Sequence, residues 1–248
     1  MHRPDPNLAP LADKLGLWRA FDTAHHTAIL ALPHVIRTLR GGEFIVREDD
    51  RPRHSCLLLA GFAIRHKVAG NGARQIFAIH LPGDLIDLHQ SMPPRADHNV
   101  QALSNVEIAF IPIEAIRDLA ERHSAISQAM WFETLIDAAT LREWMLNIGR
   151  RDARTRTAHL LCELAIRLRA AGLGERDHFQ LPMTQEQMAD ALALTNVHVS
   201  RMLALLAAGG LIERHNRRLT ILDFDRLATV GDFDPRYLHL ERYGTVAG

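Results

Sequence analysis

The chain has 248 residues, enough for one large domain or two modest ones, and its 47% hydrophobic and 23% charged residues exclude a disordered protein. Because 29 Lys and Arg residues balance 29 Asp and Glu residues, nucleic-acid binding has to be argued from a local basic patch rather than from net charge. The two cysteines, Cys56 and Cys162, lie far apart, which excludes a disulfide framework and a four-Cys cluster.

The amino-terminal segment has no apolar run of the signal-peptide type, and no stretch approaches the roughly 20 apolar residues of a membrane span. We therefore expect a cytoplasmic protein with no membrane partner. Residues 11 to 32 carry a rough apolar stripe, which predicts two short helices with a cap at Asp22-Thr23. The stripe consists of Leu11, Leu15, Trp18, Phe21, Ile29 and Leu30.

From Val35 to Ile111 the sequence alternates between short β-rich runs and turn signals. The runs are VIRTL, EFIVRE, SCLLLA, FAIRHKV, RQIFAIHL, NVQAL and VEIAFI, and Gly, Pro, Asn and Asp residues separate them. Short strands at regular spacing predict an antiparallel sandwich or roll.

Pro112 is predicted to open a short helix, and a longer helix follows from about Ser124 to Ile148. Apolar and small side chains recur along the longer helix at spacings of three and four, a coiled-coil seam suited to a partner helix. The seam consists of Trp131, Thr134, Ala138, Leu141, Met145 and Ile148. The alternative is a helix packed on its own domain. Gly149-Arg150-Arg151-Asp152 is predicted to form a hinge, in which Gly149 ends the helix and Asp152 caps the next one.

The sharpest functional pattern lies between Leu181 and Leu222. Thr184 and Gln187 form a capping box for a helix over residues 185–192, and Ala193-Leu194 makes a tight turn. Thr195 caps a second helix, from Asn196 to about Ala208, which Gly209-Gly210 closes. Two short helices joined in this way predict a helix-turn-helix.

The second helix carries polar side chains where a recognition helix meets base edges. Arg201 suits guanine O6 and N7, Asn196 suits adenine, and Ser200 and Thr195 suit phosphate oxygens. Two strands around His215-Asn216-Arg217-Arg218 follow, which predicts a basic wing. The candidate DNA-contacting residues are Thr184, Thr195, Asn196, Val197, His198, Ser200, Arg201, Arg217 and Arg218.

With these motifs the chain resembles the Crp/Fnr family of bacterial transcription regulators over nearly its whole length. The resemblance rests on TQEQMADALALTNVHVSRMLALLAAGGLI, on the early turn around Gly41-Gly42-Glu43 and on Leu81-Pro82-Gly83-Asp84. It implies an α+β fold: a β-roll of the cyclic-nucleotide-binding (jelly-roll) type over residues 1–122, a dimerisation helix over 123–149 and a winged helix-turn-helix over 150–248. It also implies a homodimer on a palindromic operator, with RNA polymerase as a partner and Arg201 on a guanine. The family's neighbouring Glu position holds Val197 here.

The effector site departs from the family's cyclic-AMP-binding members. Their Gly-Glu pair falls on Asp87-Leu88 and their Arg-Ser pair falls on Ala96-Asp97. Arg95 is one residue out of register and, on a strand, would point to the other face. Two carboxylates would repel a cyclic phosphate, so we expect regulation that does not depend on cyclic AMP. An unknown small-molecule effector remains a candidate, in a pocket that would contain Asp84, Asp87, His89, Asp97 and His98. The family's oxygen-sensing branch holds an iron–sulfur cluster on clustered amino-terminal cysteines, which are absent here.

Two other interpretations are that the chain is an enzyme, or that it is a cyclic-nucleotide-binding module whose DNA-binding domain is secondary. Histidines of the β-roll, among them His66, His80 and His98, suggest a metal site, but no pair has a compact ligand spacing. A cupin-like oxygenase would need His-x-His with a nearby Glu, and a Cys–His nucleophile would need an accessible thiol. We therefore expect no catalytic residues, no metal and no cofactor.

Overall fold

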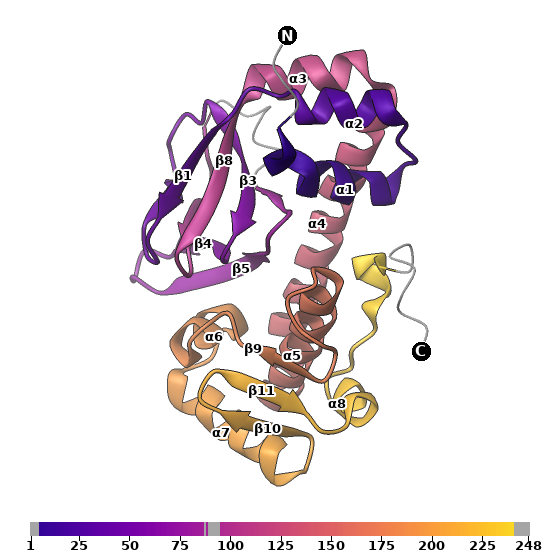
Figure 1. Cartoon of the computed structure of the whole chain (residues 1–248). Coiled ribbons are helices and arrows are strands. Elements are labelled where there is room, and N and C mark those ends of the chain that lie inside the picture. Colours follow the sequence, from indigo (N-terminus) through magenta and orange to yellow (C-terminus); the bar gives the residue numbers. More distant parts are fainter. Residues whose placement is uncertain (1–4, 87, 89–94, 241–248) are drawn as a thin grey trace. The chain divides into compact units, whose positions relative to one another are not determined.

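The computed structural model describes residues 5–86, 88 and 95–240, and the chain divides into two compact units. The first unit takes in the chain as far as His66 together with Ala78–Ala138. The second takes in Lys67–Phe77 and the chain from Ala139 onward. The predicted order of β-roll, long helix and winged helix-turn-helix is confirmed (Figure 1).

Two short helices open the first unit, as predicted. A 3-10 turn (Pro6–Leu8) leads into α1 (Ala9–Trp18), and α2 (Thr23–Leu30) follows. Asp22 caps α2, because its carboxylate accepts the backbone N–H of His25 at 2.9 Å. That hydrogen bond lowers the pKa of Asp22 below its ordinary value. The buried face of α1 consists of Leu11, Ala12, Leu15 and Trp18.

The β-roll consists of two four-stranded sheets, in which β1, β8 and β3 lie side by side (Figure 1). The strand orders are β1-β8-β3-β6 and β2-β7-β4-β5. The strands are β1 (Val35–Leu39), β2 (Phe44–Val46), β3 (His54–Ala60), β4 (Ala63–Val68), β5 (Arg74–His80), β6 (Leu85–Ile86), β7 (Asn99–Ala102) and β8 (Val106–Pro112). Only β6 was not predicted, because two residues show no periodicity.

The inward side chains of both sheets form one apolar core. Alternate residues of β7 are buried, as expected for a strand with one face on the core. The core members are Val46, Cys56, Leu58, Ala63, Ile86, Ala96, Val100, Ala102, Val106 and Ile108. Cys56, whose thiol is buried in this core, is therefore a packing residue.

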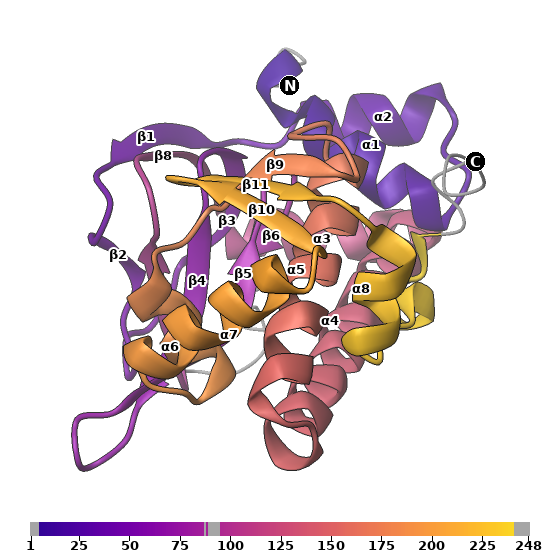
Figure 2. The ribbon, with the colours of Figure 1, turned by 90° about the horizontal axis from the view of Figure 1, so that it is seen from below.

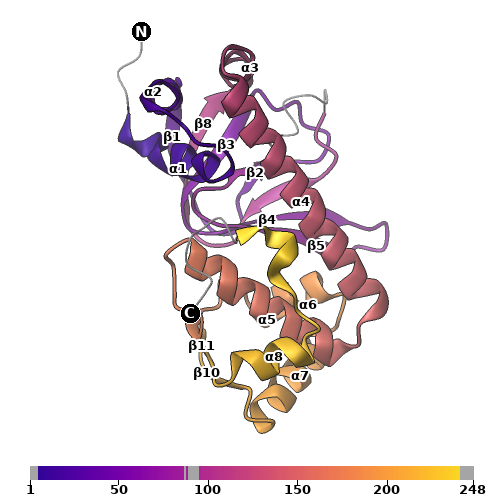
Figure 3. The ribbon, with the colours of Figure 1, turned by 90° about the vertical axis from the view of Figure 1, so that its right-hand side faces the viewer.

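Two helices follow the roll, α3 (Ile113–Arg122) and the long α4 (Ser124–Arg150), which runs in one piece in Figure 3. The break between α4 and α5 falls within the predicted segment 149–152, but α4 ends one residue later than predicted, at Arg150 and not at Gly149. Gly149 does not have a positive φ, and a Cβ there would meet nothing within 4 Å, so the helix passes through it to Arg150. Asp152 does cap the next helix, accepting the backbone N–H of Thr155 at 2.8 Å.

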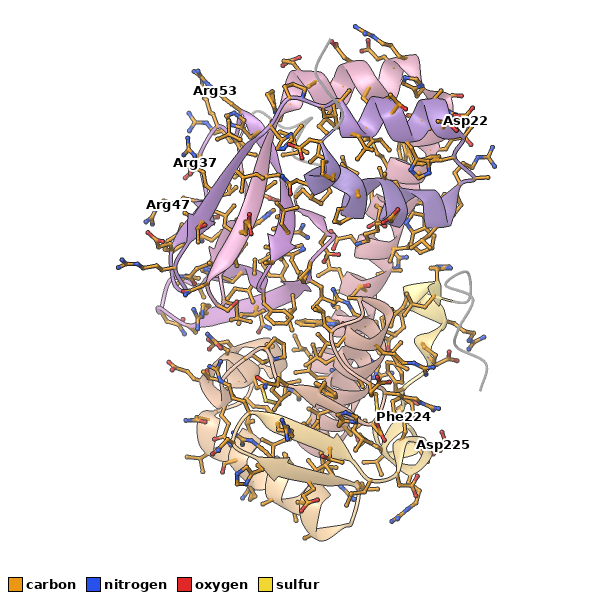
Figure 4. All side chains as sticks on the ribbon, in the orientation of Figure 1. Asp22, Arg37, Arg47, Arg53, Phe224 and Asp225 are labelled. Atoms are coloured by element: carbon orange, nitrogen blue, oxygen red, sulfur yellow. The ribbon has the colours of Figure 1, made fainter. Side chains whose placement is uncertain are left out.

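The second unit holds α5 (Ala153–Ala170), α6 (Gln185–Leu192), α7 (Asn196–Ala208) and α8 (Phe224–Val230), and a 3-10 turn (Pro235–Leu238) near its end. A small sheet of order β10-β11-β9 joins β9 (His178–Gln180), β10 (Ile212–His215) and β11 (Arg218–Ile221). The sequence did not indicate β9, of which only Phe179 is buried. Figure 4 labels Phe224 and Asp225 at the start of α8, where Arg176 lies 4.0 Å from the Phe224 ring centroid and 3.1 Å from the Asp225 carboxylate.

A buried carboxylate, Glu163 of α5, ties three segments of the second unit together. Its side chain has no exposed surface, and it accepts hydrogen bonds from Trp144 Nε1 of α4 at 2.8 Å and from the Tyr237 hydroxyl at 2.7 Å. Arg167 supplies the countercharge at 3.1 Å. Burial and the Glu163 charge raise the pKa of Tyr237 above its ordinary value. The end of α4 is thus fixed to α5 and to the carboxyl-terminal segment.

Arg151, in the link between α4 and α5, strengthens the same junction. Its guanidinium lies 2.7 Å from Glu143 and 2.9 Å from Asp232. Next to it, His159 is almost fully buried, and its ring lies 3.1 Å from the carbonyl oxygen of Gly231. Burial lowers the pKa of His159 below its ordinary value, so the ring is held neutral.

Candidate nucleic-acid interface

The first helix of the predicted helix-turn-helix begins at the predicted capping box. Gln187 donates its backbone N–H to Thr184 Oγ1 at 3.3 Å, and Thr184 donates its backbone N–H to Gln187 Oε1 at 2.7 Å. These bonds satisfy two backbone donors that a helix start otherwise leaves to water. The polar cap faces solvent while Met188, Ala189, Ala191 and Leu192 are buried.

The turn between the two helices is tight and left-handed. Ala193 has a φ of 53°, a region that a residue with a side chain enters only at some cost, and the N–H of Leu194 returns to the carbonyl of Ala189 at 3.0 Å. The turn bends the chain by 99° between α6 and α7, within the range of a helix-turn-helix (Figure 2).

The second helix, α7, has one buried face and one exposed face. Thr195 caps it by accepting the backbone N–H of His198 at 3.3 Å. The buried side chains are Val199, Met202, Leu203 and Leu206. A helix turns once in 3.6 residues, so Val197, Arg201 and Ala204 lie on the opposite face, with Asn196 and Ser200 on one flank and His198 on the other. All six of these side chains are exposed, and five of them, all but Ala204, were predicted to be.

Arg201 stands at the centre of this exposed face. In the part of the chain that the structure describes, its guanidinium has no ion pair or hydrogen bond. A charge held at a helix surface with no internal partner is available to an external acceptor. The arrangement agrees with a recognition helix whose polar face is directed outward.

The hairpin β10–β11 forms the predicted wing. Four residue pairs join its strands, from Ile212 with Ile221 to His215 with Arg218, and Asn216 turns the chain with a φ of 57°. Arg217 and Arg218 are exposed, and Arg214 Nε donates to the Asn216 carbonyl at 2.8 Å. The hairpin follows α7 directly, so both groups of predicted contacts belong to the second unit (Figure 2).

The residues of the predicted effector pocket are divided between two local pairings. Asp84 accepts the backbone N–H of Leu81 at 2.9 Å, pairs with Lys14 of α1 and lies 3.7 Å from His80. Asp97 is exposed and lies 2.7 Å from the buried His98. Asp87 and His89 lie outside the described residues.

The register argument for Arg95 is corrected by the structure. Arg95 is not in a strand, since β7 begins at Asn99, and its guanidinium donates to the carbonyl of Asp49 at 3.2 Å. Ala96 next to it is buried and exchanges two backbone hydrogen bonds with Asp49 and Asp50. Strand alternation therefore does not decide where the Arg95 side chain points.

Polar side chains also occupy the interior of the first unit. Arg65 of β4, only 8% of whose side chain is exposed, pairs with Asp137 of α4 at 2.7 Å. Burial lowers the pKa of His80 below its ordinary value. Within the described ranges no group of three or more His, Cys, Asp or Glu side chains is arranged to hold a metal ion.

A surface recess of about 200 Å³ lies elsewhere on the β-roll, lined by Arg51, Arg53, His54 and Phe110 among others. Figure 4 shows Arg37, Arg47 and Arg53 directed outward on this unit. Of the predicted effector residues that the structure describes, Asp84, Asp97 and His98 do not line the recess.

The seam predicted on α4 is exposed in part. Trp131, Leu141 and Met145 have 67%, 49% and 68% of their surface exposed, while Thr134, Ala138 and Ile148 are half-buried. Three further apolar residues that the seam did not include, Phe132, Leu135 and Leu146, are also exposed. Exposed apolar side chains in such number along one helix are typical of a surface that another chain covers.

No single helix among residues 5–86, 88 and 95–240 has the length and apolar composition of a membrane span. Only α6 and α7 taken together, across their 99° bend, reach that composition. The thiol of Cys162 is buried, and burial raises its pKa above the ordinary value.

Two protein families match separate parts of the chain. The family described as "Cyclic nucleotide-binding domain" matches residues 36–123, and the "Crp-like helix-turn-helix domain" matches residues 155–230. The first covers the β-roll with α3, and the second covers α5 to α8. Sequence and structure thus assign the same two modules in the same order.

Curated relatives and solved structures extend the match along the chain. The chain is 29% identical to the transcriptional activator protein FnrL of Cereibacter sphaeroides, over 77% of this chain and 78% of that one. It is 27% identical to the transcriptional activator protein anr of Pseudomonas aeruginosa, over 75% and 76%. The structure of FixK2 from Bradyrhizobium japonicum superposes with a TM-score of 0.74 at 26% identity, over 80% of this chain and 98% of that one.

Proposed function

Because the chain belongs to the Crp/Fnr family of DNA-binding transcription regulators, we propose that it acts as a homodimer that reads a palindromic operator through α7. The observation that carries the proposal is the outward face of α7, where Arg201 is exposed and has no partner within the described chain. A guanidinium in this position can take guanine O6 and N7 with two hydrogen bonds.

The residues around Arg201 supply the remaining contacts. Asn196 suits the adenine edge, while the hydroxyls of Thr184, Thr195 and Ser200 lie at or near helix starts, where the helix dipole favours phosphate oxygens. Arg217 and Arg218 of the wing bind the sugar–phosphate backbone. Base contacts would then determine which operator sequence is bound. The phosphate contacts of the wing would strengthen binding to any DNA duplex.

The dimer forms along α4. Exposed Trp131, Leu141 and Met145, with the half-buried Thr134, Ala138 and Ile148, make the seam that a second α4 would cover. Replacing Met145 by Asp puts a charge into that seam, and light scattering should then report a monomer where the unchanged protein is a dimer. A Glu175→Asp variant, on an exposed loop of the second unit, is the control.

We further propose that cyclic AMP is not the effector. Carboxylates at Asp87 and Asp97 oppose a cyclic phosphate, and Asp84 is already paired with Lys14. Calorimetry with cyclic AMP and cyclic GMP should detect no binding at micromolar concentrations, and tight binding of either would contradict this part of the proposal. The β-roll would respond to another small molecule, or to none.

In the cell the bound dimer would recruit or block RNA polymerase in the cytoplasm, acting by binding alone and without catalysis. Two of its curated relatives, FnrL and anr, are named transcriptional activators, which supports recruitment.

Selection of binding sites from random duplex DNA tests the proposal. We expect an inverted repeat whose half-sites are about one helical turn apart.

Arg201→Ala should weaken binding to the selected site by about 1–3 kcal/mol and relax its base preference. Arg217→Ala and Arg218→Ala should weaken binding to all sequences alike. Each should also reduce the slope of log binding constant against log salt concentration by about one. Arg122→Ala, at an exposed site on α3, is the charge-matched control. Unchanged affinity in Arg201→Ala would overturn the assignment of α7.

A further inference from the structure

Val197 is the most exposed large hydrophobic side chain of the described residues. It shows 77% of its surface, against 7% or less for Val199, Met202, Leu203 and Leu206 of the same helix. Val197 lies in the first turn of α7, four residues before Arg201. Side chains four residues apart on a helix share one face, so the valine and the arginine are neighbours on the surface proposed to enter DNA.

The geometry makes Val197 a stiff apolar contact rather than a core residue. It lies opposite the buried face of α7, and a β-branched side chain in a helix keeps essentially one rotamer. The next outward position along the helix is Ala204, whose small side chain lets the helix approach a surface closely. Two isopropyl methyl groups are thus held at a fixed place beside the guanidinium of Arg201.

The chemistry of the major groove limits what such a side chain can recognise. Every base edge there presents hydrogen-bond donors or acceptors, which valine can neither accept from nor donate to. The apolar group of the groove is the 5-methyl of thymine. A side chain that ends in methyl groups gains from contact with this methyl and gains nothing from the N4 amino group of an unmodified cytosine.

We propose that Val197 reads the 5-methyl group of a pyrimidine in each half-site, which makes it a specificity-determining residue of the operator. The inference rests on the proposed function, since it places Val197 in the groove that Arg201 reads. Four residues of helix rise about 6 Å and base pairs are 3.4 Å apart, so the methyl lies within about two base pairs of the guanine. Thymine and 5-methylcytosine carry the methyl at the same position, so both belong to the recognised class.

The test uses the operator obtained by selection. Each thymine of a half-site is replaced in turn by uracil, which removes the methyl group and leaves the hydrogen-bonding edges unchanged. We expect one position at which uracil weakens binding of the unchanged protein by about fourfold per half-site, the value of one buried methyl. The same substitutions at other positions should have no effect.

Val197→Ala completes a double-mutant cycle. It should bind the thymine and uracil operators equally, because the contacting methyl groups are gone from the protein. Leu205→Ala removes another exposed apolar side chain from the same helix, farther from its start, and should keep the fourfold preference. At the sensitive position, 5-methylcytosine should bind more tightly than cytosine only when Val197 is present, which separates the methyl from the rest of the thymine.

Two failures can be told apart. If selection yields an operator that depends on Arg201 but no uracil position matters, or if Val197→Ala keeps the uracil penalty, this inference is wrong and the proposed function stands. If selection yields no operator, or binding does not depend on Arg201, the proposed function fails and takes this inference with it.

Discussion

The two units use their polar side chains in opposite ways. In the second unit, the exposed face of α7 and the wing direct Arg201, Arg217 and Arg218 to solvent, while its internal charges meet around Glu163. In the first unit, the described residues expected at an effector site are paired within the fold, Asp84 with Lys14 and Asp97 with His98. A binding surface is easier to recognise where its charged groups lack internal partners, so the structure supports the DNA-reading surface far more strongly than a ligand pocket.

The largest effect should come from Glu163→Ala in the second unit. It leaves the buried Trp144 indole N–H, the Tyr237 hydroxyl and the Arg167 guanidinium without their shared acceptor. Removing one partner of a buried charged pair costs about 3–5 kcal/mol. Urea unfolding should show that loss, whereas Glu175→Ala on an exposed loop should stay within about 0.5 kcal/mol of the unchanged protein.

Asp137→Ala gives the corresponding change in the first unit and should cost less. The carboxylate it removes is 39% exposed, although the side chain of its partner Arg65 is 8% exposed. We expect a loss of about 1.5–3 kcal/mol, the range for a hydrogen bond to a charged group. Asp118→Ala, which breaks a solvent-exposed pair on α3, should cost at most about 1 kcal/mol. If Asp137→Ala also cost at most about 1 kcal/mol, the pair between Arg65 and Asp137 would not contribute to the stability of the first unit.

Helix caps sharpen the comparison, because each unit has a capping box of the same type. Asp22→Ala and Thr184→Ala should each cost about 1 kcal/mol in stability. Only Thr184→Ala should also weaken DNA binding, since its hydroxyl is proposed to contact phosphate. Equal DNA affinity for the two variants would remove Thr184 from the contact set.

The smallest effect is a pH dependence of the second unit. The pKa of His159 is lowered by burial, so below about pH 6.5 the unfolded chain binds a proton that the folded chain does not. Stability from this group is therefore complete above the ordinary pKa and declines as the pH falls below it. A His159→Gln variant should show a flatter dependence of unfolding free energy on pH between 5 and 7, and an unchanged slope would contradict the assignment.

Local signals in the sequence predicted the second unit well. Thr184 with Gln187, Thr195, and Gly210 with its φ of +66° act within a few residues of the helix ends that they specify. The boundaries of this motif can therefore be predicted from residues next to them, and the predicted helices at 185–192 and 196–208 are confirmed.

Long-range pairing could not be predicted in the same way. Arg65 and Asp137 are 72 residues apart, and Glu163 and Tyr237 are 74 residues apart. Neither pair has a local signature, and the sequence alone does not tell which arginine meets which carboxylate. The short strands β6 and β9 were missed because two or three residues show no alternation.

Binding of the selected operator carrying 7-deazaguanine, which lacks the N7 acceptor, tests the central claim most directly. One guanine per half-site should respond to this change, with a roughly tenfold or greater loss for the unchanged protein and little further loss for Arg201→Ala. If Arg201→Ala binds the operator as tightly as the unchanged protein, or loses as much on the modified site, Arg201 does not read the guanine and α7 is not the reading helix.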